Sequence, residues 1–180
     1  YGKERRTKII SAAESEDLVE EIEVDNSPVT LFFTKDGYFK KITPLSLRMG
    51  GEHKLKDGDE IMQSFETTNN NDLLFFTDKC QVYKAKCNDF SDSKASVLGE
   101  YIPSKLEMEE GENAIFMVVT NDYKGYMFFL FDNGKAAKVN LNSYATKTNR
   151  KKLIKAYNDK SSLKGIMYLP EDKEIVIETT

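Results

Sequence analysis

Lysine and arginine are the residues of this sequence whose number and spacing could do chemistry, and that chemistry is the binding of phosphate groups. Residues 135–155 contain seven bases and no acid, whereas residues 14–25 contain seven acids and no base. The net charge is −4, but a polyanion is steered by the local potential of a surface rather than by the net charge of the protein. The basic run therefore predicts either a polyanion-binding surface or, as the plain alternative, a solvated one.

No arrangement of residues in the sequence predicts catalysis or a metal site. His53 is the single histidine, so a Ser-His-Asp triad has no positioned base, and we expect His53 on the surface. The sequence has no glycine-rich phosphate loop followed by Gly-Lys-Ser/Thr. Cys80 and Cys87 are seven residues apart, which excludes a disulfide framework and a zinc site of usual spacing and indicates a reducing, cytoplasmic setting.

A hairpin-like phrase occurs three times, at residues 30–41, 73–84 and 127–138. Each copy has an apolar run, a tight turn and a second run, and the β-branched and aromatic residues in these runs favour strands. The turns of successive copies are 43 and 54 residues apart, and a partial fourth copy at residues 174–180 would place its turn 48 residues later. Such a period is typical of radially arranged sheets such as propeller blades, each of which needs a neighbour to cover its faces.

Short strand-like runs precede the copies, at residues 20–24, 60–65, 113–119 and 165–169. Polar turn residues join each run to the hairpin that follows it, so the unit reads as strand, turn, strand, tight turn, strand. We therefore expect an all-β, propeller-like fold of about three blades plus a partial fourth, in an incomplete ring. The expected organisation is a lead-in or linker at residues 1–16, followed by a repeat domain at residues 17–180.

The tight turns and one connection carry more local predictions. Residues 36–37 (Asp-Gly) and 133–134 (Asn-Gly) are strong signals for two-residue hairpin turns, in which both residues take positive φ. Residues 79–80 (Lys-Cys) fit such a turn less well, so we expect a longer or distorted turn in the second copy. Residues 148–158 contain no strong helix breaker, yet an extended connection is preferred to a helix there.

Several motifs, in one fixed order, resemble a known family along essentially all of the chain. The stretches "YGKERRTKI", "ESEDLVEEIEV" and "LFFTKDGYFKKITP" are similar to the junction into the C-terminal domain of the bacterial type IIA DNA topoisomerase A subunit, that is, of DNA gyrase or topoisomerase IV. "DLLFFTDKCQVYKAKCNDF" resembles the second blade of that domain, and "KDGDEI" and "EEGENAI" resemble its later connections. Each motif alone is moderately specific, and the resemblance rests on their shared order.

The resemblance implies a β-pinwheel, in which blades are arranged as in a propeller and neighbouring blades exchange a strand. It implies an accessory domain that binds and bends double-stranded DNA and contributes to DNA topology change, with no catalytic or metal-binding residue of its own. ATP and Mg²⁺ would be used by other parts of a holoenzyme that contains two A subunits together with the topoisomerase B subunit. The implied location is the bacterial cytoplasm, in association with the nucleoid and with no membrane partner.

One stretch departs from the gyrase pattern. The gyrase protein carries Gln-Arg-Arg-Gly-Gly-Lys-Gly shortly after its first hairpin, and the corresponding residues 47–53 here read "LRMGGEH". Arg48, Gly50 and Gly51 match this box, whereas Glu52 reverses the charge of the box lysine. Fewer bases and an added acid weaken phosphate contact, so the degenerate box favours a topoisomerase IV-like protein or a divergent gyrase-like one.

Given the resemblance, we expect a discontinuous basic band along the outer strands. Strand alternation puts Lys40 and Lys41 on opposite faces, so one of them must point outward. The predicted DNA-binding residues are Lys40, Lys41, Arg48, Lys54, Lys84, Lys86, Lys135, Lys138, Lys147, Arg150, Lys151 and Lys152. In the alternative, strand lysines only keep an outer strand soluble and unpaired, and the resemblance tips the balance toward DNA contact only at residues 147–152.

A second function stays open beside DNA binding. Acidic stretches at the N-terminus and in the loop at residues 100–112 are the features that a propeller-like protein-interaction module, without DNA binding, would use.

Overall fold

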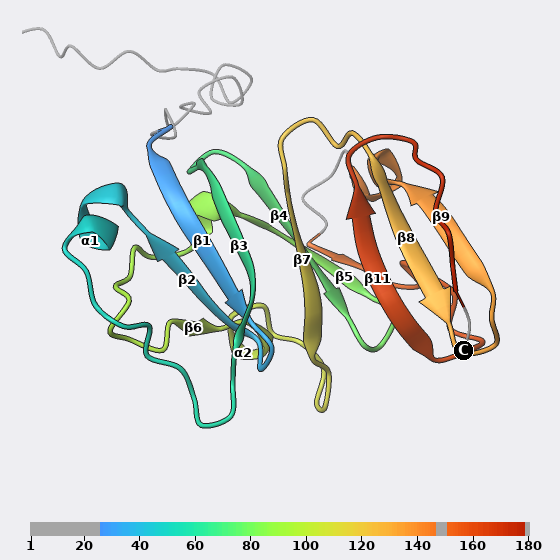
Figure 1. Ribbon diagram of the computed structural model, residues 1–180, viewed down its shortest axis with the longest axis horizontal. Helices are drawn as coiled ribbons and strands as arrows, with labels where there is room; N and C mark the ends of the chain where they lie inside the picture. The colour runs from blue at the N-terminus through green and yellow to red at the C-terminus, as the bar shows by residue number, and fades with distance from the viewer. Residues whose placement is uncertain (1–25, 147–150, 179–180) are drawn as a thin grey trace, which may run out of the picture.

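The computed structural model describes residues 26–146 and 151–178, and these residues form three antiparallel sheets that lie side by side along the long axis of the molecule (Figure 1). Each sheet is built on one of the three repeated hairpins, and we call the sheets the first, second and third blade. The expectation of an all-β fold of about three blades is therefore confirmed.

The three blades follow one plan. The first has the order β3-β1-β2-β6, with β1 at Pro28–Thr34, β2 at Tyr38–Ile42, β3 at Ile61–Thr68 and β6 at Glu100–Tyr101. The second has the order β10-β5-β4-β7, with β4 at Asp72–Thr77, β5 at Val82–Lys86, β7 at Ala114–Thr120 and β10 at Lys152–Leu153. The third has the order β11-β8-β9, with β8 at Tyr126–Phe131, β9 at Ala136–Asn140 and β11 at Leu163–Leu169.

Short helical segments lie in the connections between strands. They are α1 at Pro44–Arg48, α2 at Ile102–Lys105, and single 3₁₀ turns at Cys87–Asp89 and Leu141–Tyr144. The first of them starts after Thr43, whose hydroxyl accepts a hydrogen bond from the Ser46 N–H, and Pro44 supplies a preset φ at the first helical position.

Neighbouring repeats exchange a strand. The run that precedes each hairpin pairs with the hairpin before it, so that β3 pairs with β1, β7 with β4 and β11 with β8. The prediction from the repeats, that residues 60–65 form one unit with the hairpin at residues 73–84, is therefore wrong, whereas the exchange implied by the resemblance is confirmed. Sequence order could not show this, because a strand can pair equally well with either neighbour when both present apolar, β-branched surfaces.

The three tight turns are three-residue loops rather than two-residue turns. Positive φ occurs at the third loop residue, with 88° at Gly37 and 74° at Gly134, while the residue before each glycine keeps a negative φ. In the second blade Cys80 takes this place with φ 58°. The second turn is thus no longer than the others, and its expected distortion takes the form of a non-glycine residue in the left-handed region, where a Cβ is strained.

Two apolar cores hold the blades together, one at each boundary. Phe33 of the first blade lies 5.8 Å from Phe75 of the second, measured between ring centroids, and Phe76 lies 6.0 Å from Phe129 of the third. These four rings are fully buried, and burying a phenylalanine contributes about 1.5–3 kcal/mol. Adjacent phenylalanines in β4 therefore serve different boundaries, because successive strand residues face opposite sides of a sheet.

The partial fourth copy does not form a hairpin strand. Its leading run is β11, which completes the third blade, and residues 170–178 have no regular secondary structure. Residues 151–158 contain β10 and no helix, as preferred from the sequence. The expected strand at residues 20–24 and the lead-in at residues 1–16 lie outside the described residues.

Candidate nucleic-acid interface

Lysines occupy one equivalent position in all three hairpins, and each of them is paired with an acid. Lys41 lies opposite Leu31, Lys84 opposite Leu74 and Lys138 opposite Phe128, so each is on the strand that leaves the tight turn. Their ammonium groups form ion pairs with Asp92, Asp72 and Asp172 respectively. Their common place in the repeat therefore reflects a recurrent ion pair at least as much as a basic surface.

Both lysines of β2 are buried, so the expectation that one of them points outward is wrong. Lys40 is 1% exposed, and its Nζ donates hydrogen bonds to the carbonyl oxygens of Lys54 at 2.8 Å and Ala95 at 3.0 Å. Lys41 is 4% exposed, and its Nζ lies 3.2 Å from an Asp92 carboxylate oxygen and 2.9 Å from Asn69 Oδ1. The two side chains lie on opposite faces of β2, as strand alternation predicts. The connections that follow β2 and β5, however, fold back and cover both faces.

Asp72 gathers the two lysines of β5. Lys86 Nζ lies 2.7 Å from Asp72 Oδ1, Lys84 Nζ lies 3.3 Å from Oδ2, and the Tyr123 hydroxyl donates to Oδ2 at 2.6 Å. Burial alone would raise the pKa of Asp72, but the hydrogen bonds from Lys86 and Tyr123, with the charges of both lysines, hold it below its usual value. Lys86 stays exposed and Lys84 is half-buried, so of this pair Lys86 is better placed to meet solvent.

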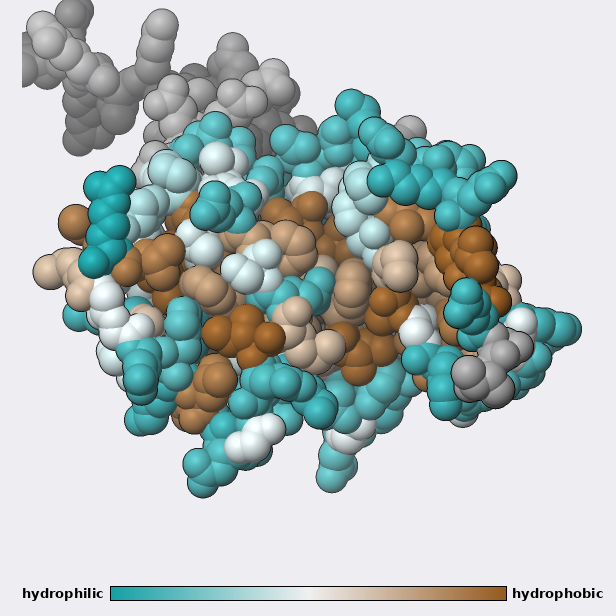
Figure 2. Space-filling view, in the orientation of Figure 1, coloured by the Kyte–Doolittle hydropathy of each residue, from teal (hydrophilic) through white to brown (hydrophobic). Residues whose placement is uncertain are grey.

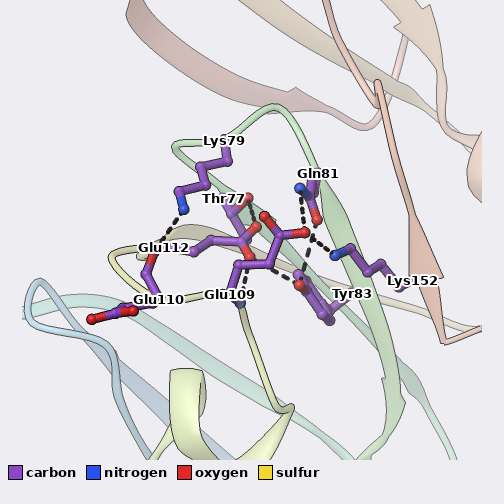
Figure 3. A network of polar contacts seen from close by, with 8 residues as sticks. All are labelled: Thr77, Lys79, Gln81, Tyr83, Glu109, Glu110, Glu112 and Lys152. Atoms are coloured by element: carbon purple, nitrogen blue, oxygen red, sulfur yellow. Dashed lines mark hydrogen bonds and ion pairs between the residues drawn. The ribbon is translucent and has the colours of Figure 1, made fainter.

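Lys152 is held by the acidic loop that precedes β7. Its Nζ pairs with Glu109 Oε1, and this hydrogen bond is the main reason that the pKa of Glu109 is lowered and the pKa of Lys152 is raised. Figure 3 shows the Glu109 carboxylate between Lys152 on one side and Gln81 on the other. One of the predicted phosphate ligands therefore already has a carboxylate partner.

The same loop carries a buried carboxylate at Glu112. Its oxygens accept hydrogen bonds from Thr77 Oγ1 at 2.5 Å, from the Tyr83 hydroxyl at 2.9 Å and from the Glu109 N–H at 3.0 Å (Figure 3). At 3% exposure it binds the loop to the β4–β5 hairpin. Two acids of the loop at residues 100–112 thus face the protein itself, which leaves fewer of them for a protein partner.

Four predicted residues are exposed and have no ion pair within the described parts of the chain: Arg48, Lys54, Lys135 and Lys151. Arg48 and Lys54 lie in the connection between β2 and β3 of the first blade, Lys151 lies directly before β10 of the second, and Lys135 lies in the tight turn of the third, so the structure does not gather them on one strand. Lys147 and Arg150 lie outside the described residues. Lys94, in the connection after β5, is exposed in the same way, and sequence reasoning missed it because it belongs to no repeated motif.

The stretch that corresponds to the gyrase box ends α1 and continues into an exposed loop. Gly50 and Gly51 have φ of 74° and 139°, and Arg48 and Glu52 are both exposed. His53 is half-buried rather than on the surface, with its ring centroid 4.4 Å from that of Phe32. Burial and the nearby Lys40 charge lower the pKa of His53, so it is neutral at pH 7.

An apolar groove of about 280 Å³ lies on another face, between the exchanged strands β3, β7 and β11. Phe65, Phe116 and Ile166 line it, and Met62 and Met167 are exposed on the same strands. Figure 2 shows apolar side chains across the middle of this face, with hydrophilic ones above and below. Gln63 joins two of the strands, because its amide both donates to the Met117 carbonyl oxygen and accepts from the Met117 N–H.

Among residues 26–146 and 151–178 no cluster of histidine, cysteine or acidic side chains could hold a metal ion. Cys80 and Cys87 are free thiols, and burial raises the pKa of Cys87 to about 11. In the same part of the chain, none of the helices has the length and apolar character to cross a bilayer.

Comparison with known proteins identifies relatives over the whole chain. The DNA gyrase A protein of Mycoplasma genitalium is 27% identical over 190 residues, which cover 100% of this chain and 22% of that protein. The DNA topoisomerase 4 A protein of Staphylococcus epidermidis is 27% identical over 180 residues, which cover 97% of this chain and 22% of that protein. The chain thus spans about a fifth of the length of these relatives. No protein-family model matches it.

Two solved structures share the fold. The C-terminal domain of DNA topoisomerase IV aligns with a TM-score of 0.71 at 24% identity, over 82% of this chain and 47% of that one. The C-terminal domain of E. coli ParC aligns with a TM-score of 0.59 at 15% identity, over 81% of this chain and 58% of that one. The resemblance predicted from the sequence is therefore confirmed: the chain is similar along its whole length to the A subunits of DNA gyrase and topoisomerase IV, and it has the open β-pinwheel fold of their C-terminal domains.

Proposed function

We propose that this chain is an accessory domain of a bacterial type II topoisomerase, which binds and bends double-stranded DNA through contacts to phosphates and carries no catalysis of its own. The observation that carries the proposal is the similarity to topoisomerase A subunits along the whole chain, combined with the fold of a topoisomerase IV C-terminal domain. On each blade there are exposed bases that have no acidic partner among the described residues, and they support the proposal, because sequence-independent affinity for DNA comes mainly from lysine and arginine.

We also propose partners and a location, which the similarity to these relatives supports. The partners are double-stranded DNA and, in the holoenzyme, the topoisomerase B subunit together with a second copy of the A subunit. The location is the bacterial cytoplasm, in association with the nucleoid. ATP and Mg²⁺ act in other parts of that holoenzyme, and this stretch needs neither.

Within this family we place the chain nearer to topoisomerase IV or to a divergent gyrase than to a wrapping gyrase. Arg48 is the one base left in the degenerate box, and Glu52, also exposed, stands where the gyrase box has lysine. A carboxylate beside a phosphate opposes binding, so the contact here is weaker than that of a complete box.

The proposal is tested by measuring the affinity for a duplex of about 40 base pairs at several salt concentrations. A logarithm of affinity that falls linearly with the logarithm of salt is expected, with a slope of about −0.9 for each phosphate contacted. Neutralising Arg150, Lys151 and Lys152 together should flatten this slope by about two rather than three, because Lys152 is already paired with Glu109. Absent binding at low salt, or binding that salt leaves unchanged, would contradict the proposal.

A second candidate function is a protein-interaction module, and the apolar groove between β3, β7 and β11 favours it. The two functions differ in their sensitivity to one variant. Met167→Lys places a charge on the groove, and none of the four exposed bases without an ion pair lines that groove. Loss of a protein partner with unchanged DNA affinity would favour the interaction module, and the reverse result would favour DNA binding.

A further inference from the structure

Helix α1 and its C-terminal cap present three large apolar side chains to solvent, and no residue of the helix is buried. Leu45 is 70% exposed, Leu47 is 37% exposed and Met49, the cap residue, is 81% exposed. Figure 1 shows α1 at the outer end of the first blade, away from the other two sheets. Single exposed apolar residues are ordinary, but a group of them marks an interaction site.

The repeat explains the exposure of Leu47. This residue lies six residues after the paired strand lysine of its hairpin, and Phe90 and Tyr144 lie at the same distance in the second and third blades. Both rings are buried at a boundary between blades, with Phe90 against rings of the first two blades and Tyr144 against Phe76. Leu47 is exposed because no preceding blade covers this side of the first one among the described residues.

The repeat does not explain Leu45 and Met49. In the second and third blades the corresponding positions are polar, and they are occupied by Asn88 and Asn142, and by Asp92 and Thr146. Asn88 and Asn142 are exposed to solvent even though their blades have a preceding neighbour. A preceding blade would therefore not be expected to cover Leu45 and Met49, and their apolar character is particular to the first blade.

Leu45 and Met49 lie on one face of a turn that is fixed at both ends. The Met49 N–H donates to the Leu45 carbonyl oxygen at 3.1 Å, so the two residues are one helical turn apart and their side chains are neighbours. Thr43 caps the start of the helix. Beyond its end, the buried Lys40 Nζ donates to the Lys54 carbonyl oxygen at 2.8 Å and anchors the connection.

Positive charge accompanies the apolar pair. Arg48 lies next to Met49 in the sequence and three residues after Leu45, it is exposed, and it forms no ion pair with any residue in the described parts of the chain. Proteins that bend DNA from the minor groove combine arginine or lysine with an apolar wedge, often leucine or methionine, that enters between two base steps. The side chains of α1 have this combination.

We propose that Leu45 and Met49 form an apolar wedge that enters the minor groove of duplex DNA at a base step, while Arg48 contacts the adjoining backbone. The inference rests on the proposed function and adds to it a means of bending the duplex. Met49 stands where the gyrase box has its second arginine, so the change that removes a phosphate contact supplies half of the wedge. Pyrimidine–purine steps are the expected sites, because they kink most easily.

The test uses Leu45→Asn/Met49→Thr, which gives α1 the residues of the third blade at these positions. The matched control, Met62→Asn/Met167→Thr, changes two other exposed side chains, on β3 and β11. Circular dichroism verifies that both variants fold. Salt titrations should give the α1 variant the slope of the native protein, because no phosphate contact is lost, and an affinity about three- to tenfold lower. The control should match the native protein.

Bending and unstacking are measured directly with the intact protein and a duplex of about 40 base pairs that contains TA steps. Energy transfer between dyes at the two ends reports the bend, and the fluorescence of 2-aminopurine beside the TA steps reports broken stacking. We expect the native protein and the control to bend the duplex and raise this fluorescence. The α1 variant should bend the duplex much less and leave the fluorescence low.

Three results would overturn the wedge and leave the proposed function standing. They are an α1 variant that bends and unstacks the duplex as the native protein does, bending by the native protein without any rise in 2-aminopurine fluorescence, and an α1 variant that loses a protein partner while its effect on DNA is unchanged. Absence of salt-dependent binding by the native protein would instead overturn the proposed function.

Discussion

Strands β2 and β5 pass through corresponding places in the first and second blades, yet they bury different groups there. Lys40 lies opposite Phe32, and Tyr83 lies opposite Phe75, so the two side chains occupy equivalent positions of their hairpins. Tyr83 packs in the core between two blades and donates its hydroxyl to Glu112, whereas Lys40 lies under two connections and donates to their carbonyl oxygens. In both blades a polar tip at a buried position ties down a connection between strands.

The difference between the two strands comes from what covers them. The second blade has a neighbour on both sides, so a large ring fills the space between sheets. The outer side of the first blade meets no other blade among the described residues, and its own connections cover it instead. Carbonyl oxygens are what a connection offers, and an ammonium group on a long stem can reach two of them at once. The same contrast extends to the next lysines, since the partner of Lys84 is a buried acid and the partner of Lys41 an exposed one.

The largest loss of stability is expected when the buried carboxylate of Glu112, which ties down the connection at the second blade, is removed. Glu112→Ala should lower the free energy of unfolding by about 4 kcal/mol, because it leaves the Thr77 and Tyr83 hydroxyls and the Glu109 N–H without their buried acceptor. Urea denaturation measures the change, and the exposed neighbour variant Glu110→Ala is the control, with an expected change below about 0.5 kcal/mol. Equal effects of the two variants would show that the buried carboxylate does not stabilise the fold.

In the first blade, Gly99→Ala tests the close approach of the connection before β6 to strand β2. A Cβ there would meet the Phe39 carbonyl oxygen at 2.3 Å, so we expect a loss of about 2–3 kcal/mol from strain and from lifting the connection off β2. Gly111→Ala is the matched control, since Gly111 also has positive φ, 71°, but no atom within 4 Å. It should cost only the backbone term of about 1 kcal/mol, and chemical denaturation of both variants isolates the contribution of the close approach.

The ion pairs of Asp72 in the second blade should make a smaller contribution to the free energy of unfolding than Glu112 or Gly99, and this contribution should depend on pH. The pKa of Asp72 is lowered in the folded state, so its ion pairs stabilise the protein above its unfolded pKa of about 3.9, and this stabilisation is lost as pH falls through the folded pKa. Asp72→Asn should therefore lose about 1.5 kcal/mol at neutral pH and converge with the native protein as the pH falls below about 4. Asp92→Asn, which alters the exposed partner of Lys41, is the control at neutral pH, and an equal loss of stability in the two variants there would refute the contrast.

The smallest effect is expected on DNA binding by the acidic loop. Glu109→Gln removes the carboxylate that holds Lys152, so it should raise DNA affinity by about two- to threefold and steepen the salt slope by up to about 1. Glu107→Gln removes the same charge from an exposed position of the same loop and serves as the control. If both variants raise the affinity equally, the effect is general electrostatics rather than the release of Lys152.

The sequence was most informative where local chemistry decides the outcome. Repeated apolar and aromatic runs predicted the hairpins, and glycines at the turns predicted where the chain reverses. The predicted turn type was wrong at residues 36 and 133. Asp and Asn before Gly suit a two-residue turn, but they also fit the middle of a three-residue loop. Cys80 shows the limit most clearly, since nothing in its residue type favours the left-handed region that it occupies.

The candidate interface was less predictable than the fold, because ion pairs join residues that lie far apart in the sequence. Lys41, Lys84 and Lys138 looked like a basic band in the sequence, but their acidic partners lie 51, 12 and 34 residues away along the chain. Lys54 and Lys94, which form no ion pair with any residue in the described part of the chain, lie in connections without a repeated pattern.

The sequence by itself determined the all-β class, the number of hairpins and the family, because these follow from the order of apolar runs and turns along the chain. Only the tertiary structure decided which strands pair and which bases meet solvent. Strand exchange between neighbouring blades depends on contacts between distant segments. Burial of Lys40 depends on the two connections whose carbonyl oxygens accept its hydrogen bonds. Both are set by packing in three dimensions, where residues far apart in sequence compete for the same partners.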